Sequence, residues 1–92
     1  MGSTKRSKPT RLAEKLLQIR ESLHLSQNQM LDRLGMKDTH FRSIISSFEL
    51  GSRQPSYLVL LSYAQIAGVC CDVLINDELD LPKKLPAKPK HS

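Results

Sequence analysis

The feature that most constrains the fold is the stretch of residues 26–55, which predicts two short helices separated by a turn. Ser26 and Gln29 have the S-x-x-Q spacing of a capping box, in which each side chain accepts a hydrogen bond from the other residue's backbone N–H. Gly35 is placed to end the first helix, because glycine readily adopts the left-handed backbone angles found there. Gly51 is placed to end the second helix in the same way. Two closely spaced helices with these end signals favour a small all-α fold.

Apolar residues in both predicted helices recur at the spacing that gathers them on one face. In the first helix these residues are Met30, Leu31 and Leu34. In the second helix, at positions i, i+3, i+4 and i+7, they are Phe41, Ile44, Ile45 and Phe48. We expect this second set to belong to the core, with Ile44 partly exposed. The opposite face of the second helix contains small polar residues and one arginine: Arg42, Ser43, Ser46 and Ser47. Because these side chains are mostly small, the face projects little from the helix, which suits entry into a groove better than burial against protein.

At this point the sequence resembles a known family. Residues 45–51, ISSFELG, followed by Arg53 and by the Pro-Ser pair at 55–56, resemble the I-S-x-x-E-x-G…P-S signature of Cro/C1-type (XRE family) helix-turn-helix transcriptional regulators. Upstream, the LSQ of residues 25–27 and the LG of residues 34–35 are similar to the L-S-Q…L-G of that family. The likeness covers roughly residues 16–75. It implies an all-α, five-helix, lambda-repressor-like DNA-binding domain with its helix-turn-helix at the second and third helices.

The chain departs from the family pattern around the turn. The interval from Gly35 to Ile45 is about four residues longer than the family usually has, and Leu31 stands where the family has a small alanine. A larger residue at the helix crossing and a longer turn would both hold the third helix further from the second. The sequence therefore predicts a longer than usual turn and an altered angle of presentation for the third helix.

The resemblance also implies a function and its residues. It implies sequence-specific binding of double-stranded DNA by a transcriptional regulator, with the third helix in the major groove. Base contacts then fall on Arg42, Ser43 and Ser47. Arginine can donate to both O6 and N7 of a guanine, whereas serine discriminates weakly between bases. Phosphate contacts fall on Gln27, Arg53, His40 and Lys37. The alternative roles are a solvent-facing Arg42 and a surface ion pair for Arg53, and Glu49 is expected to pair internally.

The segment before residue 26 predicts a first helix. Thr10 is placed to cap it, and four apolar residues repeat at helical spacing: Leu12, Leu16, Ile19 and Leu23. The charged residues of this helix are expected to be exposed: Glu14, Lys15, Arg20 and Glu21. His24 falls at the helix end, where a positive charge is mildly favourable.

The segment after residue 55 predicts two more helices. The fourth helix is capped by Ser56 and ends at Gly68, with five residues facing inward: Tyr57, Leu60, Leu61, Ala64 and Ala67. A short fifth helix is expected over residues 71–77. After it, Leu79 and Leu81 are expected to lie as a strap on the core.

The charge of the chain is concentrated near its ends. The formal net charge is +5, yet residues 12–69 contain 6 basic and 5 acidic residues. We therefore divide the chain into a basic flexible arm (1–10), a helix-turn-helix domain (11–81) and a basic flexible tail (82–92). Basic tails either bind the phosphate backbone non-specifically or serve as solvated ends. With no apolar run near 18 residues and no signal peptide, we expect a cytoplasmic protein with no membrane partner.

Few residues in the sequence indicate catalysis, cofactor binding or metal binding. The adjacent cysteines at 70 and 71 are expected to be small buried apolar residues, and the scattered histidines predict no metal site. No catalytic constellation or cofactor motif is present, so we expect no enzyme activity and no cofactor. The expected partner is double-stranded DNA, bound by a homodimer on a palindromic site. The alternative is a protein-interaction adaptor or antitoxin-like module with the same fold, a protein partner and weak or secondary DNA binding.

Overall fold

The computed structural model describes residues 11–85, and the regular secondary structure there is entirely helical. Its five helices are α1 (Leu12–Ser22), α2 (Gln27–Arg33), α3 (Arg42–Leu50), α4 (Tyr57–Ala67) and α5 (Cys71–Ile75). The predicted all-α fold with five helices is confirmed over this range. The predicted arm, residues 1–10 with the cap at Thr10, lies outside the described residues, as do residues 86–92 of the predicted tail.

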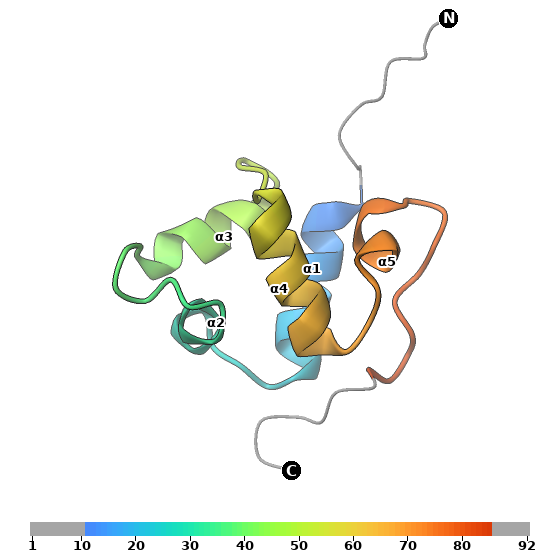
Figure 1. The fold of residues 1–92 in the computed structure, drawn as a ribbon, viewed down its shortest axis with the longest axis horizontal. Helices are drawn as coiled ribbons and strands as arrows, with labels where there is room; N and C mark the ends of the chain where they lie inside the picture. The colour runs from blue at the N-terminus through green and yellow to red at the C-terminus, as the bar shows by residue number, and fades with distance from the viewer. Residues whose placement is uncertain (1–10, 86–92) are drawn as a thin grey trace, which may run out of the picture.

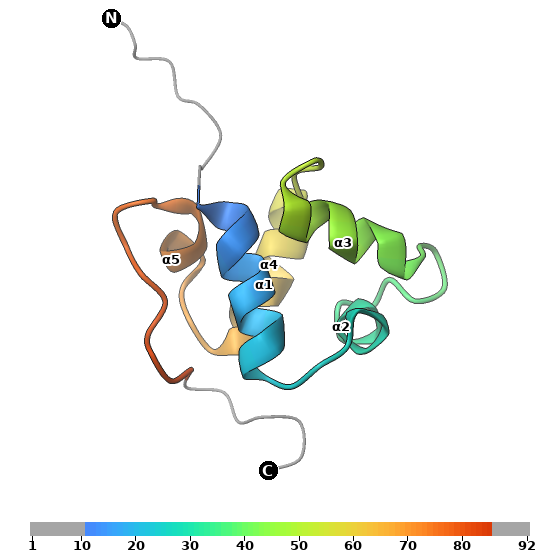
Figure 2. The ribbon, with the colours of Figure 1, turned by 180° about the vertical axis from the view of Figure 1, so that it is seen from behind.

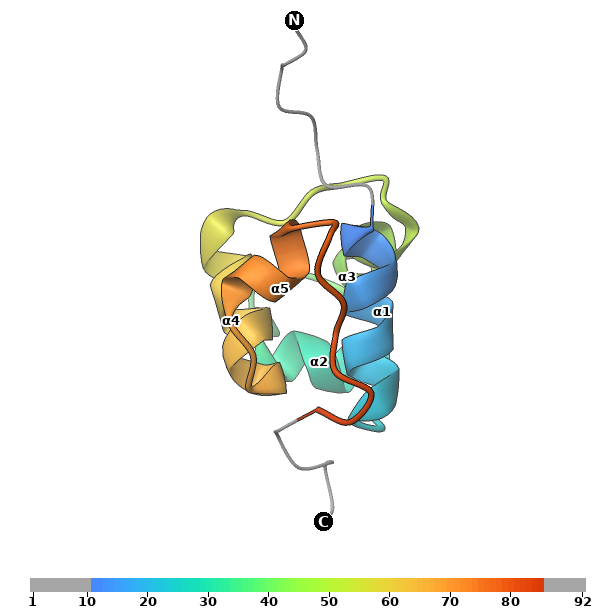
Figure 3. The same ribbon diagram turned by 90° about the vertical axis from the view of Figure 1, so that its right-hand side faces the viewer.

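Helix α1 occupies the middle of the molecule. It contacts α3, α4 and α5, while α2 packs against α3. Figures 1 and 2 show the pair α2 and α3 on one side of α1, and α5 with the segment that follows it on the other. The end-on view of Figure 3 shows that this final segment runs back along α1. The pair α2 and α3 therefore packs on a scaffold formed by α1, α4 and α5.

The core contains side chains from every helix. Seven of its members are 0% exposed: Leu16, Ile19, Met30, Ile45, Tyr63, Ala67 and Leu74. Of the inward faces predicted for the first two helices, Leu12, Leu16, Ile19, Leu23, Met30 and Leu31 are buried, while Leu34 is partly buried against the core. Of the set predicted for α3, Ile45 and Phe48 are buried and Ile44 is partly exposed, as expected. Burial of this apolar surface is what holds helices this short in place.

The predicted helix ends are also present. The backbone N–H of Gln29 donates to Ser26 Oγ (3.0 Å), and the Ser26 N–H donates to Gln29 Oε1 (2.7 Å), which completes the capping box. Ser56 Oγ caps α4 by accepting from the Val59 N–H (3.3 Å). Gly51 and Gly68 have φ of 80° and 79° at the ends of α3 and α4, a region that side chains with a Cβ rarely adopt.

At the end of α1 a residue other than glycine adopts the same left-handed backbone conformation. His24 has φ 59°, and the backbone N–H groups of His24 and Leu25 donate to the carbonyls of Glu21 and Arg20, both at 3.1 Å. This is the hydrogen-bond pattern of a Schellman motif, which reverses the chain direction at a helix end. It carries the chain directly from α1 into the cap of α2.

Two predicted core positions are exposed. Phe41 is 84% exposed because it precedes α3 and has extended backbone angles (φ −106°, ψ 162°), so helical spacing does not describe its direction. Tyr57 is 66% exposed on the first turn of α4. Leu61 is partly buried, while Leu60, Ala64 and Ala67 are buried as predicted. The aromatic residue that fills the core from α4 is Tyr63, which was not among the residues predicted to face inward.

The prediction that Lys15 is exposed is wrong. Its side chain is 1% exposed, and Nζ donates to the carbonyls of Val73 (2.7 Å), Asn76 (3.0 Å) and Leu79 (2.7 Å). These carbonyls lie at the end of α5 and just after it, where helix carbonyls have no partner within the helix. Burial lowers the pKa of Lys15. These three hydrogen bonds from Lys15 connect the end of α5 to α1.

The segment after α5 follows the predicted strap in part. Helix α5 ends at Ile75, two residues before the predicted end, and Leu81 is buried, whereas Leu79 is 40% exposed. Leu85 is buried as well, which the composition of residues 82–92 did not indicate. The Arg11 side chain donates to the Asp77 carbonyl (2.6 Å) and pairs with Asp80.

The two cysteines differ from the expectation of burial. Cys70 is exposed just before α5, and Cys71 is partly exposed as the first residue of that helix. Burial raises the pKa of the Cys71 thiol. Among residues 11–85 no group of three or more His, Cys, Asp and Glu side chains is arranged to hold a metal ion.

Candidate functional site

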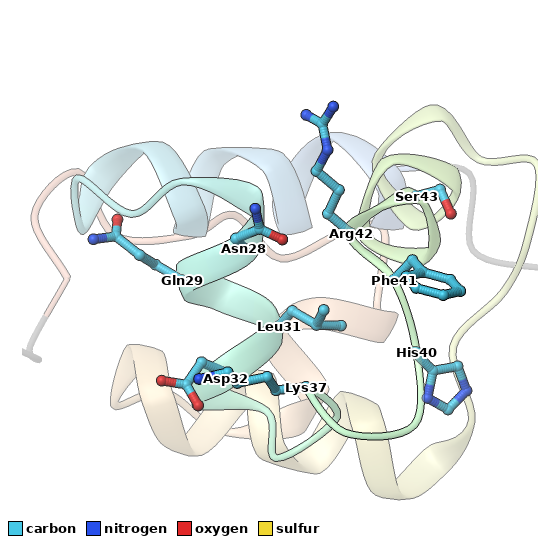
Figure 4. A pocket seen from close by; sticks show the side chains of 9 residues that line it. All are labelled: Asn28, Gln29, Leu31, Asp32, Lys37, His40, Phe41, Arg42 and Ser43. Carbon is cyan, nitrogen blue, oxygen red and sulfur yellow. The ribbon is translucent and has the colours of Figure 1, made fainter.

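A cleft of about 600 Å³ opens between α2 and the start of α3. Figure 4 shows it with the side chains that line it. From α2 these are Asn28, Gln29, Leu31 and Asp32. From the turn and the start of α3 they are Lys37, His40, Phe41, Arg42 and Ser43. The cleft therefore brings together four of the seven residues that the resemblance assigns to DNA contact: Lys37, His40, Arg42 and Ser43.

Arg42 is the first residue of α3 and is exposed. Figure 4 shows its side chain extending away from the ribbon into open space. Within residues 11–85 no acidic side chain pairs with it. Its neighbour Ser43 is exposed too. The start of α3 therefore presents a guanidinium fork, which can donate two parallel hydrogen bonds to a planar acceptor, with no competing partner in the described chain.

The long turn between α2 and α3 has a defined structure of its own. Gly35 (φ 74°) ends the first part, and the Met36 carbonyl then accepts from the N–H groups of Thr39 (3.1 Å) and His40 (2.9 Å). Thr39 Oγ1 lies 2.8 Å from His40 Nδ1, and the Met36 side chain packs on the core. A helical turn anchored by Met36 thus fills the added length. It places Lys37 and His40 at the rim of the cleft.

Helix α3 is held to α1 by a largely buried ion pair. Arg20 Nε donates to Glu49 Oε2 (2.7 Å) and Arg20 Nη2 to Glu49 Oε1 (3.1 Å), with 16% and 5% of the two side chains exposed. The Glu49 carboxylate raises the pKa of Arg20. Arg20 Nη1 also donates to the Leu25 carbonyl (3.0 Å), just before α2. The predicted internal pairing of Glu49 is confirmed, and the predicted exposure of Arg20 is wrong.

Gln27 lies outside the cleft, half-buried at the start of α2. Its Nε2 donates to Glu49 Oε1 (3.2 Å), so this amide joins the same network as Arg20. A glutamine amide nitrogen has two hydrogens, and the bond to Glu49 uses one of them. Gln27 therefore joins the starting turn of α2 to the last turn of α3 and retains a second donor.

The other predicted contact residues lie apart from the cleft. Ser47 is half-buried, and its Oγ donates to the Ile44 carbonyl (2.7 Å) within α3. That bond leaves the hydroxyl oxygen of Ser47 as an acceptor. Arg53 is exposed in the turn after α3, where its backbone N–H donates to the Ser47 carbonyl (3.3 Å).

Five residues of the cleft were not predicted as contacts, and three of these five are exposed. Asn28 and Asp32 are exposed on α2, and Phe41 is exposed immediately before α3. A signal for Asn28 was available, since it follows the assigned Gln27 on the same helix turn. Phe41 was assigned to the core because its spacing from Ile44 and Ile45 fits a helix. The structure shows that α3 begins at Arg42, so helical spacing does not apply to Phe41.

Comparisons with known proteins agree with this architecture. No family model matches the chain. The chain is 35% identical over 66 residues to the uncharacterized HTH-type transcriptional regulator YqaE of Bacillus subtilis (strain 168), a match that covers 72% of this chain and 53% of the relative. The chain thus spans about half the length of the curated relative it matches. No helix in the described part of the chain has the length and apolarity needed to cross a membrane.

Proposed function

We propose that this chain binds double-stranded DNA sequence-specifically, as a Cro/C1-type (XRE family) transcriptional regulator with a lambda-repressor-like fold. The observation that supports this most directly is the exposed start of α3, where Arg42 and Ser43 border the cleft with α2. The relative's description as an HTH-type transcriptional regulator supports the same function. The proposed activity is binding without catalysis or a cofactor, in the cytoplasm.

In this proposal α3 enters the major groove with its first turn toward the base edges. Arg42 donates to O6 and N7 of a guanine, which distinguishes that base from the other three. Ser43, beside it, contacts a base edge as donor or acceptor. Ser47 contributes its hydroxyl oxygen as an acceptor, because its proton is engaged with Ile44. Arg42 therefore supplies most of the base discrimination among these three residues.

The phosphate contacts are proposed for residues around this helix. The second amide hydrogen of Gln27 is available to a phosphate at the start of α2, where the helix dipole also favours an anion. Lys37 and His40 on the long turn and Arg53 after α3 are exposed and supply further donors. Contacts of this kind fix position and orientation, and they weaken as salt increases.

The proposed dimer uses the side of the molecule opposite the cleft. Ile75 of α5 is 41% exposed and Leu79 is 40% exposed, and both are apolar. We place the two-fold axis here, so that the two copies present their α3 helices to the two half-sites of a palindrome.

A second candidate function is a protein-interaction adaptor or antitoxin-like module. It is favoured by three exposed apolar side chains at the end of α3 and the start of α4. Their exposed fractions are 78% for Leu50, 71% for Leu58 and 66% for Tyr57. Large apolar side chains that are exposed to solvent occur on protein-binding surfaces.

Selection of bound duplexes from a randomised DNA pool, at near-physiological salt, tests the proposal. Enrichment of a two-fold-symmetric sequence is the expected result and would establish a dimeric, sequence-specific regulator. Enrichment of a single half-site would support DNA reading and contradict the dimer. Binding without enrichment, or no binding, would overturn sequence-specific recognition and favour the adaptor.

A further inference from the structure

Phe41 makes little contribution to the fold that holds it. Its side chain is 84% exposed, the highest value among the exposed large apolar residues of the described chain, and it is absent from the core. It is also the N-cap residue of α3, where it provides no side-chain hydrogen bond. A phenylalanine at this position therefore stabilises α3 neither by packing nor by capping.

The other capped helices show what stability alone would select here. The N-cap residues of α2 and α4 are Ser26 and Ser56, and each accepts a backbone N–H with its hydroxyl. Phe41 has the same extended backbone conformation as those serines (φ −106°, ψ 162°), so a serine would fit without rearrangement. Departures from the locally favoured residue concentrate at functional positions. Cys70, the N-cap residue of α5, also provides no side-chain cap, so the feature of position 41 that calls for an explanation outside folding is its exposed aromatic ring.

The position of Phe41 supplies that explanation. It lines the same cleft as His40, Arg42 and Ser43. Figure 4 shows its ring and the Arg42 side chain leaving the start of α3 in different directions. Consecutive Cα atoms are about 3.8 Å apart, close to the spacing of about 3.4 Å between stacked bases. Two side chains that diverge from adjacent residues can therefore reach adjacent base pairs.

Because the phenyl ring is apolar, it limits the groups on a base edge that Phe41 can contact. In the major groove one base edge presents an apolar group, the C5-methyl of thymine, and apolar side chains such as Phe contact it. The charges that surround Phe41 are mixed: Lys37, His40 and Arg42 are basic or titratable, and Asp32 lies across the cleft on α2. The cationic groups suit a nucleic-acid partner, while the ring itself has no charge to contribute.

We infer that Phe41 is a specificity-determining residue that packs against the C5-methyl group of a thymine next to the base pair read by Arg42. This inference rests on the proposed function, because it requires α3 to enter the major groove. It adds a hydrophobic contact to a reading surface otherwise composed of hydrogen-bonding side chains.

The test compares two versions of the enriched duplex, one with thymine and one with deoxyuridine, which lacks the methyl group. We expect the full chain to bind the thymine duplex about fourfold more tightly for each methyl contacted, the factor that burial of one methyl group gives. Phe41→Ala should bind both duplexes equally. Leu58→Ala, at another exposed apolar residue outside the cleft, should retain the preference.

Phe41→Ser separates recognition from stability. We expect it to raise the denaturant midpoint by adding a cap to α3, while it abolishes the preference for thymine over deoxyuridine. A structural role for Phe41 would instead lower the midpoint and weaken binding to both duplexes alike.

The outcomes distinguish failure of this inference from failure of the proposed function. An enriched sequence bound equally well with deoxyuridine, or a preference that survives in Phe41→Ala, would overturn the inference while DNA reading stands. No enriched sequence at all would overturn both.

Discussion

Arg20 and Glu49 join α1 to α3 through two hydrogen bonds, from Nε to Oε2 at 2.7 Å and from Nη2 to Oε1 at 3.1 Å. Because Arg20 also bonds the Leu25 carbonyl and Glu49 also accepts from Gln27, this pair connects the end of α1, the start of α2 and the last turn of α3. The orientation of the proposed reading helix therefore depends on a contact that touches no DNA.

Breaking this ion pair should be costly, whereas removing both partners should not. Arg20→Met leaves a Glu49 carboxylate that is 5% exposed without its cation, and we expect a loss of about 3 to 5 kcal/mol in the free energy of unfolding. The double variant Arg20→Met/Glu49→Met should lose much less, because no charge stays buried and unpaired. Denaturant unfolding of the four proteins in the cycle measures the coupling. Additive losses would show that the two side chains act independently.

Arg42→Ala should alter base preference. Loss of a two-bond contact to guanine typically costs about 1 to 3 kcal/mol and relaxes the preference at one base pair. Repeating the duplex selection with the variant measures both effects. Because Arg42 is exposed and pairs with no acid of the described chain, the thermal midpoint should not change. An identical enriched sequence would show that Arg42 reads no base.

Arg53→Ala should weaken all DNA sequences alike. Each phosphate neutralised adds about 0.9 to the slope of log affinity against log salt, so the magnitude of this slope should fall by about one. Fluorescence anisotropy at several salt concentrations measures it, with Arg42→Ala as the comparison. A changed base preference at constant slope would place Arg53 against a base instead of the backbone.

Lys15→Met should loosen the end of α5. The variant keeps an apolar stem of similar length but removes the donor to three carbonyls, and hydrogen bonds to a charged group are worth about 1.5 to 3 kcal/mol. Hydrogen exchange of residues 71–79 and the free energy of unfolding should both report the loss. Lys37→Met, at an exposed lysine, is the matched control and should change stability by less than about 0.5 kcal/mol. Equal stability of the two variants would contradict the anchoring role of Lys15.

Tyr63 should resist ionisation until the chain unfolds. Burial, with a smaller contribution from the Glu49 carboxylate, raises the pKa of its phenol above the ordinary value of about 10. Since the folded chain holds this proton more tightly than the unfolded chain, Tyr63 contributes stability that is present below about pH 10 and declines above it. The lowered pKa of Lys15 acts in the opposite sense, so phenolate absorbance is a cleaner readout than stability.

The background Tyr57→Phe makes this measurement specific, because the chain contains two tyrosines. In that variant the phenolate signal should appear together with the loss of helical circular dichroism as the pH rises. A signal that develops while the helices stay intact would show that the Tyr63 hydroxyl is open to solvent.

The sequence predicted the helices well because their signals are local. The capping box at Ser26 and Gln29, the serine cap of α4 and the glycine ends of α3 and α4 depend on residues within one helical turn. Spacing placed Leu16, Ile19 and Ile45 in the core for the same reason. One boundary at α3 was misplaced, and that single shift turned Phe41 from a predicted core residue into an exposed one.

The errors among charged residues have a different origin. Lys15 and Arg20 border the apolar stripe of α1, and their exposure was predicted from their charge. Their burial depends on partners distant in the chain: the carbonyls in α5 and just after it are 58 to 64 residues from Lys15, and Glu49 is 29 residues from Arg20. Hydrogen bonds over such separations leave no periodic pattern in the sequence.

The three bonds from Lys15 also set an order of events during protein synthesis. The ribosome makes Lys15 58 to 64 residues before the carbonyls of Val73, Asn76 and Leu79 exist. At about 5 to 20 residues per second this interval lasts roughly 3 to 13 seconds. During that time the ammonium group must stay in water, because burying it without acceptors is unfavourable. The acceptors that accompany burial of Lys15 in the core thus become available only after Leu79 has been made and has left the ribosome, and a chain that ends before that residue should fold incompletely.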